Sequence, residues 1–435
     1  MSARTRELTI LILVGLITVT GFASVYIARQ NELSPGSLSY AGIFFVLYLA
    51  AHLVARFTVP DADPYLLPIA ALLTALGLTE IYRLNPTDAL RQGLWVVIGV
   101  AAFATTLITL RHDYRRLESY KYLFGLSALV LLFLPALPKI GQTVNGARLW
   151  VRFGPLQFQP GELGKVAMIV FLAAYLHSKQ EVLAQGRPKD FGPLLAIWGC
   201  AMLVLVATHD LGSALLFFGI FLAILYLATN RLLYVSVGTG LFLIGAAGVY
   251  ETTAHVRSRV IIWLHPWTIQ KLPCHTPHGV ELMTRQQCGS YQLVKSLYSV
   301  AQGGFFGTGL GKGTFTLPGG GNLIPDLNTD FIFSALAQEL GLVGIAALLL
   351  VLMLFVVRGF HIALLATDGF SKLVCAGLTF GFALQTFIII GGILRLIPLT
   401  GITLPFISYG GSSVVANFIL LAGLLLVSQR ANETP

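Results

Sequence analysis

Long apolar runs, each about 20 residues in length, recur along this chain of 435 residues and constrain its fold more than any other feature. A helix of about 20 residues is long enough to cross the ~30 Å hydrocarbon core of a bilayer. Charged residues make up only 11% of the chain, against roughly 25% in a soluble domain. So few charges cannot cover a globule of this size with a hydrated surface, which excludes a soluble enzyme. The sequence therefore predicts an all-α polytopic membrane protein.

Twelve of these runs have the length of membrane-spanning helices. They cover about 8–28, 40–59, 66–84, 92–110, 122–138, 160–178, 194–209, 212–229, 232–252, 331–357, 373–395 and 409–428. The first run also has the basic start of a signal peptide, but its length and the lack of a clean cleavage site favour a retained helix. A large polar loop, 253–330, separates the ninth span from the tenth.

If every span crosses the membrane once, the loops that are rich in lysine and arginine all lie on the same side of the membrane. This bias predicts that these loops and both termini are cytoplasmic, and that segments 139–159 and 253–330 lie outside. The net charge is +9, but the basic residues are scattered between apolar runs and form no stripe. Nucleic-acid binding is therefore not expected.

Two adjacent motifs carry polar groups beside the sixth span. The first contains Arg148, Trp150 and Arg152, and the second is Gln159–Lys165. Within the second, Glu162 and Lys165 are three residues apart and project from one helix face. Two interpretations stay open: a buried ion pair that fixes packing, or a polar cavity open to the outer face with the two arginines above it to meet an anion.

Asp210 precedes the eighth span, where an isolated aspartate is either a helix N-cap or a catalytic group. Further along, residues 280–301 have apolar side chains at helical spacing and predict an amphipathic helix on the outer leaflet or plugging the bundle. A glycine-rich segment, 303–313, follows and is not a phosphate-binding P-loop. Lys312 within it is a candidate anion contact.

Asp330 stands where the large loop enters the tenth span. Partial removal from water raises the pKa of a carboxyl group and makes it a better proton acceptor, although a helix N-cap is again the alternative, with Thr329 competing for that role. Glu339 is nine residues further, about 13 Å along a helix, and at that depth it needs a partner such as Lys165.

Segment 398–413 reads as a broken helix, which survives at membrane depth only where it lines a cavity or is covered by protein. Arg395 adds a positive charge at its start, and Ser408 and Ser412 are candidate substrate contacts.

Of the four cysteines, Cys200 and Cys375 fall in spans and predict packing roles. Cys274 and Cys288 share the outer loop, on an oxidising side in bacteria, and could close a ring of 15 residues. Whether these two are bonded stays open.

The order of six motifs resembles the SEDS family (shape, elongation, division and sporulation), the RodA and FtsW type. Here they read NGARLW, QPGELGK, DLGSA, GGFFGTGLG, IPDLNTDFIF and PLTGITLPFISYGGSS. The resemblance implies a core of ten spans over 66–430, including loop 253–330. Residues 1–65 would then be two additional N-terminal helices, and 431–435 a short cytoplasmic tail.

The resemblance further implies a peptidoglycan glycosyltransferase of the bacterial cytoplasmic membrane. Such proteins polymerise lipid II into glycan strands at the outer face, beside a class B penicillin-binding protein that cross-links the strands. The essential aspartate of the family matches Asp330, its motif tryptophan matches Trp150, and its glutamate and lysine match Glu162 and Lys165. The family usually has a D-P pair where this chain has His265-Pro266, and residues 263–290 contain what looks like an insertion, so ligand contacts there are not carried over.

This chemistry needs a base for the acceptor hydroxyl and positive charge for the departing diphosphate. We expect Asp330 to be the base and an inverting transfer. The candidates for diphosphate binding, alone or with a divalent cation (Mg²⁺ or Mn²⁺) and without an organic cofactor, are Arg148, Arg152, Lys312 and Arg395. Two other functions stay open, a lipid II flippase and a scaffold that only activates the penicillin-binding protein. The motifs do not separate a role in elongation from one in division.

Overall fold

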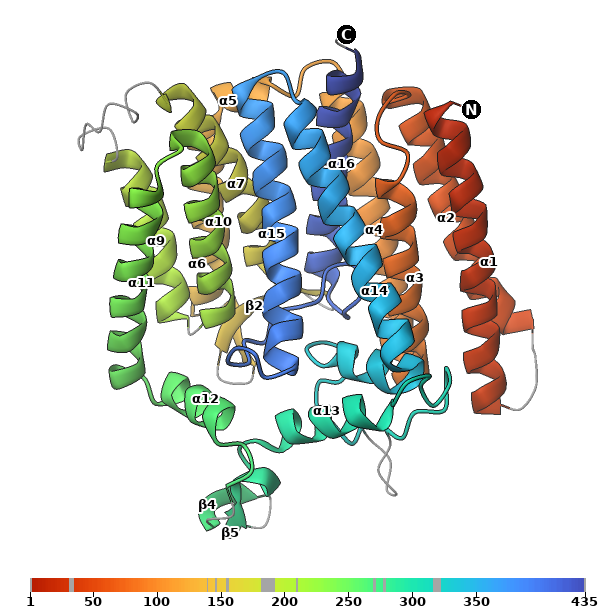
Figure 1. The fold of residues 1–435 in the computed structure, drawn as a ribbon, viewed down its shortest axis with the longest axis vertical. Coiled ribbons are helices and arrows are strands. Elements are labelled where there is room, and N and C mark those ends of the chain that lie inside the picture. Colours follow the sequence, from red (N-terminus) through yellow and green to blue (C-terminus); the bar gives the residue numbers. More distant parts are fainter. Residues whose placement is uncertain are drawn as a thin grey trace.

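The computed structural model describes residues 2–30, 35–138, 140–144, 147–153, 156–180, 192–208, 210–268, 271–276, 279–315 and 322–433. A bundle of roughly parallel helices forms the body of the protein (Figure 1). The long helices are α1 (Ala3–Gln30), α2 (Pro35–Thr58), α3 (Leu66–Leu84), α4 (Pro86–Leu110), α6 (Lys121–Phe133), α7 (Pro160–Ser178), α9 (Gly192–Ala207), α10 (Leu211–Thr229), α11 (Leu232–Thr252), α14 (Ile332–Leu365), α15 (Gly369–Ile393) and α16 (Gly411–Glu433).

Each predicted span overlaps one of these helices. Nine helices of the described chain are long and apolar enough to cross a membrane, and α6 and α9 are shorter apolar helices. Helix α7 carries the charged pair Glu162 and Lys165, which lowers its hydropathy. The prediction of a polytopic helical membrane protein is therefore confirmed. Helix α16 extends through Glu433, beyond the predicted end of the core at residue 430.

Helix ends differ from the prediction where polar residues cap them. Asn85 accepts hydrogen bonds from the backbone N–H groups of Thr87 and Asp88, and Pro86 suits the first helical turn, so α4 begins at 86 rather than 92. Asp368 caps α15 in the same way, through the N–H of Ser371.

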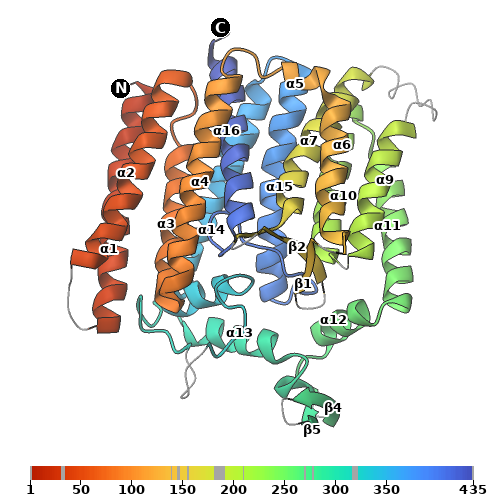
Figure 2. The same cartoon turned by 180° about the vertical axis from the view of Figure 1, so that it is seen from behind.

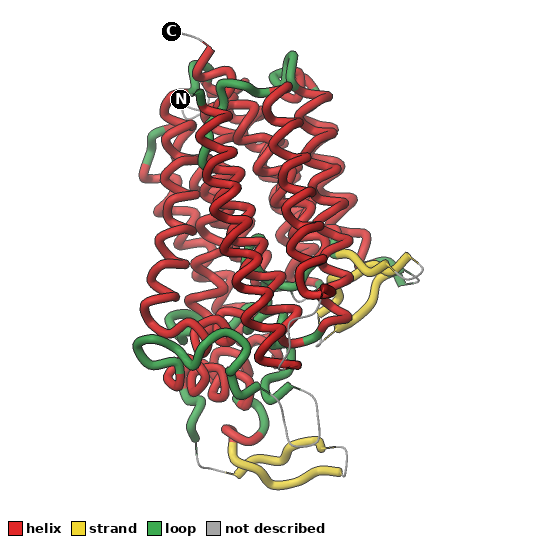
Figure 3. Tube along the Cα trace, turned by 90° about the vertical axis from the view of Figure 1, so that its right-hand side faces the viewer, coloured by secondary structure: helices red, strands yellow, loops and turns green. Residues whose placement is uncertain are grey.

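Among the described residues, the segments outside the bundle add short strands to the all-α membrane bundle that the sequence predicts. A three-stranded antiparallel sheet contains β1 (Gly141–Val144), β2 (Ala147–Phe153) and β3 (Leu156–Phe158), and β4 (Lys271–Thr276) pairs with β5 (Gly279–Thr284). In Figure 3 the first sheet lies against the side of the bundle and the β4–β5 hairpin extends beyond its end. Short strands are possible here because this part of the chain is not confined to lipid, where an open sheet edge would leave backbone groups unpaired.

The predicted helix over 280–301 is therefore only partly right. Helix α13 covers Tyr291–Gln302, whereas β5 and a short 3₁₀ turn, Arg285–Gln287, precede it. Thr284 and Gln287 form a reciprocal capping box that starts this turn. Its local hydrogen bonds compete with continuation of the helix toward residue 280.

Both chain ends lie at one end of the bundle, and the loop between α11 and α14 lies at the other (Figures 1 and 2). This loop contains α12 (Ala254–Leu264), which the sequence analysis did not predict, and α13. Helix α16 runs through the centre of the bundle, and 89% of the residues in its most apolar 18-residue stretch are buried. None of the residues in the corresponding stretch of α11 is buried.

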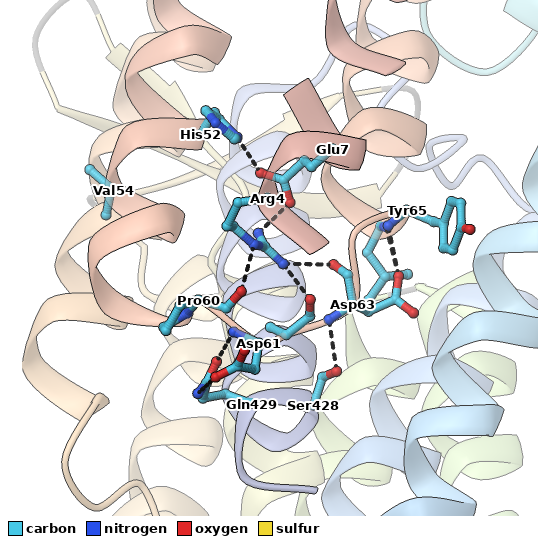
Figure 4. A network of polar contacts seen from close by, with 12 residues as sticks. Arg4, Glu7, His52, Val54, Pro60, Asp61, Asp63, Tyr65, Ser428 and Gln429 are labelled. Carbon is cyan, nitrogen blue, oxygen red and sulfur yellow. Dashed lines mark hydrogen bonds and ion pairs between the residues drawn. The ribbon is translucent and has the colours of Figure 1, made fainter. Parts of the chain in front are cut away.

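Helices α1 and α2 and the loop after them are joined to one another and to α16 by polar contacts at the end where the termini lie (Figure 4). Arg4 of α1 forms an ion pair with Glu7, and its Nε donates to the carbonyl of Pro60 at 3.2 Å. Glu7 Oε1 also lies 2.6 Å from Nδ1 of His52 in α2. Asp63 in the following loop donates its N–H to Ser428 Oγ of α16 at 2.9 Å. Residues 1–65 thus share one polar hub with the central helix.

Candidate active site

Asp330 lies in the turn that precedes α14, at the end of the bundle away from the termini, and its side chain points toward Gly401. A side-chain carbon on Gly401 would lie 3.3 Å from Asp330 Oδ2 and 3.9 Å from Arg259 Nη2. The carboxyl group and the guanidinium therefore both lie close to Gly401, whose lack of a side chain leaves space there. The pKa of Asp330 is raised to about 7, by burial first and then by the charge of Asp326, against the lowering effect of Arg259.

Arg259 is the functional candidate that the sequence analysis missed. It lies on α12, where its Nη1 donates to the carbonyl of Leu399 at 2.9 Å and its Nε donates to His255 Nε2 at 3.1 Å. His255 and Arg259 are four residues apart on one helix face, a signal that becomes visible only once α12 is recognised as a helix.

Segment 398–410 holds the loop that carries Asp330. Ser408 Oγ donates to the carbonyl of Thr329 at 2.6 Å and accepts the N–H of Leu404 at 2.9 Å. The N–H of Tyr409 donates to the carbonyl of Asn328 at 2.8 Å. This irregular segment is covered by protein over much of its length, and it fixes the backbone immediately before Asp330.

The pair Glu162 and Lys165 forms a buried ion pair, with Nζ 2.9 Å from Oε2. Lys165 also donates to Gln385 of α15, whose amide donates to the carbonyl of Thr403 at 2.9 Å. The pair thus connects α7 and α15 to the irregular segment. This geometry favours the packing interpretation, because both charges are satisfied by protein groups.

The expected contact between Glu339 and Lys165 is wrong. Glu339 instead lies 3.3 Å from Nε of Arg83 in α3 and accepts the N–H groups of Gly311 at 2.7 Å and Gly313 at 3.0 Å. The depth of Glu339 was predicted for a straight helix, but α14 bends at Gly341, which has φ 67°. The glycine-rich loop folds against this bend and supplies the partners.

Asp210 is a helix cap. Its side chain accepts the N–H of Ser213 at 2.9 Å at the start of α10, and it is buried. His209 before it lies outside the described residues. The charges of Asp210 and Arg259 interact, so this cap belongs to the electrostatic surroundings of the site.

The cations predicted from the sequence have other surroundings. Arg148 Nη2 donates to the carbonyl of Leu137 at 2.9 Å. Arg395 donates from Nε to the carbonyl of Trp263 at 2.7 Å and from Nη2 to that of Leu264 at 2.9 Å. Arg395 thereby ties α12 to the end of α15.

The remaining candidate residues lie on the protein surface or in the contacts between helices. Arg152 on β2 and Lys312 in the glycine-rich loop are exposed, and Trp150 on β2 is half-buried opposite Gln142. Ser412 Oγ accepts the N–H of Gln159 at 2.7 Å, which joins the start of α16 to the start of α7.

An apolar cavity of about 820 Å³ reaches the site from the side. It lies between α9, α10, α11 and α12, and its wall includes Trp198, Phe218, Leu241 and Leu399. Arg259 is the one charged residue among the lining side chains that the structure describes. The cavity therefore combines a long apolar wall with one cation next to Asp330.

Cys288 is disulfide-bonded, whereas Cys200 and Cys375 are free. The side chain of Cys274 on β4 lies outside the described residues, so its pairing with Cys288 stays a prediction. Among the residues that the structure describes, no three or more His, Cys, Asp or Glu side chains gather as metal ligands.

Comparison with known proteins finds sequences of one family that are similar to this chain. Residues 64–433 match the family described as cell cycle protein, FtsW/RodA/SpoVE. The chain is 40% identical to peptidoglycan glycosyltransferase RodA of Mycobacterium leprae over 99% of this chain and 91% of that protein. It is 31% identical to a probable peptidoglycan glycosyltransferase FtsW of Geobacter metallireducens over 86% of this chain and 96% of that protein.

The fold is similar to a chain of a solved peptidoglycan synthase complex, described for its structural coordination of polymerization and crosslinking. The TM-score is 0.68 and the identity 27%, over 86% of this chain and 99% of that chain.

Proposed function

The chain belongs to the FtsW/RodA/SpoVE family and is a RodA-type peptidoglycan glycosyltransferase that polymerises lipid II, and we propose that Asp330 is the base of its reaction. The observation that carries the proposal is the position of Asp330, which lies across Gly401 from Arg259, a lining residue of the apolar cavity. A carboxyl group whose pKa is about 7 is poised to take a proton near neutral pH.

The proposed reaction transfers a glycosyl group from the donor diphosphate to the acceptor hydroxyl. The hydroxyl oxygen of the acceptor sugar forms a bond to the anomeric carbon of the donor, and the bond from that carbon to the diphosphate oxygen breaks. The bonding electrons leave with the diphosphate, and the hydroxyl proton passes to the carboxylate of Asp330. Attack from the face opposite the leaving group inverts the anomeric centre.

Arg259 is proposed to stabilise the departing diphosphate, because a fixed guanidinium beside an apolar wall acts strongly on developing negative charge. The apolar cavity behind it is proposed to take part of the polyprenyl tail of one substrate. Arg152 and Lys312 remain proposed contacts for outer parts of the substrate, together with Trp150. Arg148 and Arg395 are proposed to shape the site through the backbone carbonyls they bind.

The polar groups beneath the site are proposed to position it. Gln159, Ser408 and Ser412 hold the irregular segment and α7 together, and the pair Glu162 and Lys165 anchors the same segment from below. Asp210 and Glu339 are proposed as supporting residues.

A divalent cation, Mg²⁺ or Mn²⁺, stays part of the proposal as a companion of the substrate diphosphate. The described side chains do not form a ligand cluster of their own, and Asp330 faces an arginine. The steps proposed above do not involve the ion. Strand synthesis in chelator-treated protein, with and without added Mg²⁺ or Mn²⁺, tests the need for it.

We further propose the membrane placement and the partner. Helices α6, α7 and α9 would complete twelve crossings with the nine longer helices, which puts both termini in the cytoplasm and Asp330 at the outer face of the cytoplasmic membrane. The likeness to a synthase complex that polymerises and crosslinks supports a transpeptidase partner, a class B penicillin-binding protein.

The experiment compares purified wild-type protein with Asp330→Asn and with Glu251→Gln, a matched change at an exposed carboxylate near the end of α11. Each is given lipid II in detergent and, separately, in vesicles. We expect glycan strands from wild type and Glu251→Gln, and strand synthesis lowered by roughly 10²–10⁴-fold in Asp330→Asn. Lipid movement across vesicles without strands would support a flippase. Strands made at equal rate by Asp330→Asn would remove Asp330 as the base.

A further inference from the structure

Arg91 lies on the outer end of α4, and its guanidinium is not used by the reaction as described so far. Its side chain is 65% exposed, and its Nη1 lies 3.6 Å from Oδ1 of Asp88. Its charge also acts on the hydroxyl of Tyr409, which belongs to the irregular segment. Arg91 therefore lies beside Asp88 and Tyr409 while most of its surface stays available to a ligand.

This cluster is connected directly to the loop that carries Asp330. Asp88 Oδ2 accepts the amide N–H of Asn328 at 2.9 Å, and Asn328 also accepts the backbone N–H of Tyr409 at 2.8 Å. Asn328 is two residues before Asp330. The loop thus contacts α4 through Asn328 and faces α12 through Asp330, and these two helices lie on different sides of the bundle end (Figures 1 and 2).

Below Arg91, α4 presents an apolar stripe to its surroundings. Leu90, Leu94, Val97 and Ile98 are all exposed, with Leu94 reaching 66%, and their spacing places them along one helix face. In the proposed membrane placement this face meets lipid chains, and Arg91 lies near its end on the side of the phosphate headgroups of the outer leaflet. The combination of an exposed cation and a lipid-facing stripe matches a polyprenyl diphosphate.

Resting on the proposed function, we propose that Arg91 binds the diphosphate of the second lipid-linked substrate, whose tail lies along the exposed face of α4. The joining of two lipid II molecules brings two diphosphates and two polyprenyl tails to one base. The cavity beside Arg259 takes one of them, so the other must approach Asp330 from a different side. A guanidinium can bind a phosphate through two parallel hydrogen bonds, which fixes the attached saccharide relative to the base.

The test counts lipid II molecules bound to the full-length protein by native mass spectrometry, in an Asp330→Asn background that blocks turnover. We expect two bound lipid II molecules. Adding Arg91→Glu should leave one, adding Arg91→Lys should retain the second, and adding Arg111→Glu at the opposite end of α4 should retain both. A protein that keeps one lipid II and loses the other is folded, so the Arg91→Glu result cannot be attributed to misfolding.

With Asp330 intact, Arg91→Glu should raise the lipid II concentration for half-maximal strand synthesis by roughly 10- to 100-fold, as expected for the loss of a hydrogen bond to a charged group. Saturation at a single lipid II, or two molecules bound with unchanged affinity in Arg91→Glu, would overturn the proposal. Failure of the proposed function has a different signature, because strand synthesis by Asp330→Asn would then persist however many lipid II molecules are bound.

Discussion

Asp330 owes its chemistry to burial and to two charged neighbours, Asp326 in its own loop and Arg259 on α12. Burial and Asp326 raise its pKa, whereas Arg259 lowers it, and the balance leaves it at about 7. The base acts in its deprotonated form, so strand synthesis should rise with pH through about 7 and level off above about 8. Because Arg259 lowers this pKa, Arg259→Gln should move the midpoint to higher pH. Initial rates of strand synthesis between pH 5.5 and 9 check this, and an unmoved midpoint in Arg259→Gln with wild-type rates would contradict it.

We propose that Ser408 positions the base through the backbone of the loop that carries it. Its hydroxyl bonds both Thr329 and Leu404, so Ser408→Ala removes two buried hydrogen bonds and should lower the unfolding free energy by about 1–2 kcal/mol. We expect strand synthesis to fall while lipid II binding is retained. Ser236→Ala, at an exposed hydroxyl on α11, is the control for both thermal stability and activity. Equal effects of the two substitutions would refute this role of Ser408.

At the scale of residues, the sequence predicted Asp330 but not Arg259. Asp330 stands at the junction of a polar loop and an apolar run and within a recognisable motif. Arg259 has no such context, because α12 is short and its basic residues read as ordinary loop charges. The partner of Glu339 was mispredicted for a related reason, since the positive φ of Gly341 and the folding back of a glycine-rich loop are tertiary features.

At the scale of elements, the bend in α14 brings the glycine-rich loop onto Glu339. Gly341 has φ 67°, and a side-chain carbon there would lie 2.2 Å from the backbone nitrogen of Gly307. Gly341→Ala should therefore displace the loop and lower the melting temperature, because both strain and a backbone clash are introduced. Gly245→Ala, on α11 with no neighbour within 4 Å, is the matched control and should be neutral or slightly stabilising. Thermal unfolding in detergent checks both substitutions. The prediction fails if Gly341→Ala has the same melting temperature as wild type.

Helices of this protein could be predicted from the sequence because each one must bury its backbone in lipid over about 20 residues. The strands could not. Strands β1, β2 and β3 contain 4, 7 and 3 residues, and they pair through contacts that periodicity does not reveal. The capping box at Thr284 likewise shortened the amphipathic helix that the apolar spacing indicated.

At the scale of the whole molecule, the N-terminal helices, the central helix and α14 meet in one polar hub. Oδ2 of Asp63 accepts a hydrogen bond from the guanidinium of Arg358 in α14. Oδ1 of Asp63 accepts the N–H of Leu66, the first residue of α3, at 3.2 Å. Asp63→Asn should weaken the ion pair and lower the unfolding free energy by roughly 1–3 kcal/mol. Strand synthesis per folded molecule should be unchanged, because the hub lies at the opposite end from Asp330.

Asp113→Asn, which removes a largely exposed ion pair with Arg116, is the control for this substitution. We expect its melting temperature to stay close to that of wild type. A loss of strand synthesis in Asp63→Asn at temperatures where the protein remains folded would show that the hub is coupled to the active site.

The central claim is that the carboxylate of Asp330 takes the proton of the acceptor hydroxyl. Its most direct test is the single-turnover rate of glycosidic bond formation in Asp330→Asn, measured with lipid II binding shown to equal that of wild type. We expect a rate at least about 100-fold below that of wild type at pH 8, where the wild-type base is deprotonated. Equal rates for the two proteins under these conditions would contradict it.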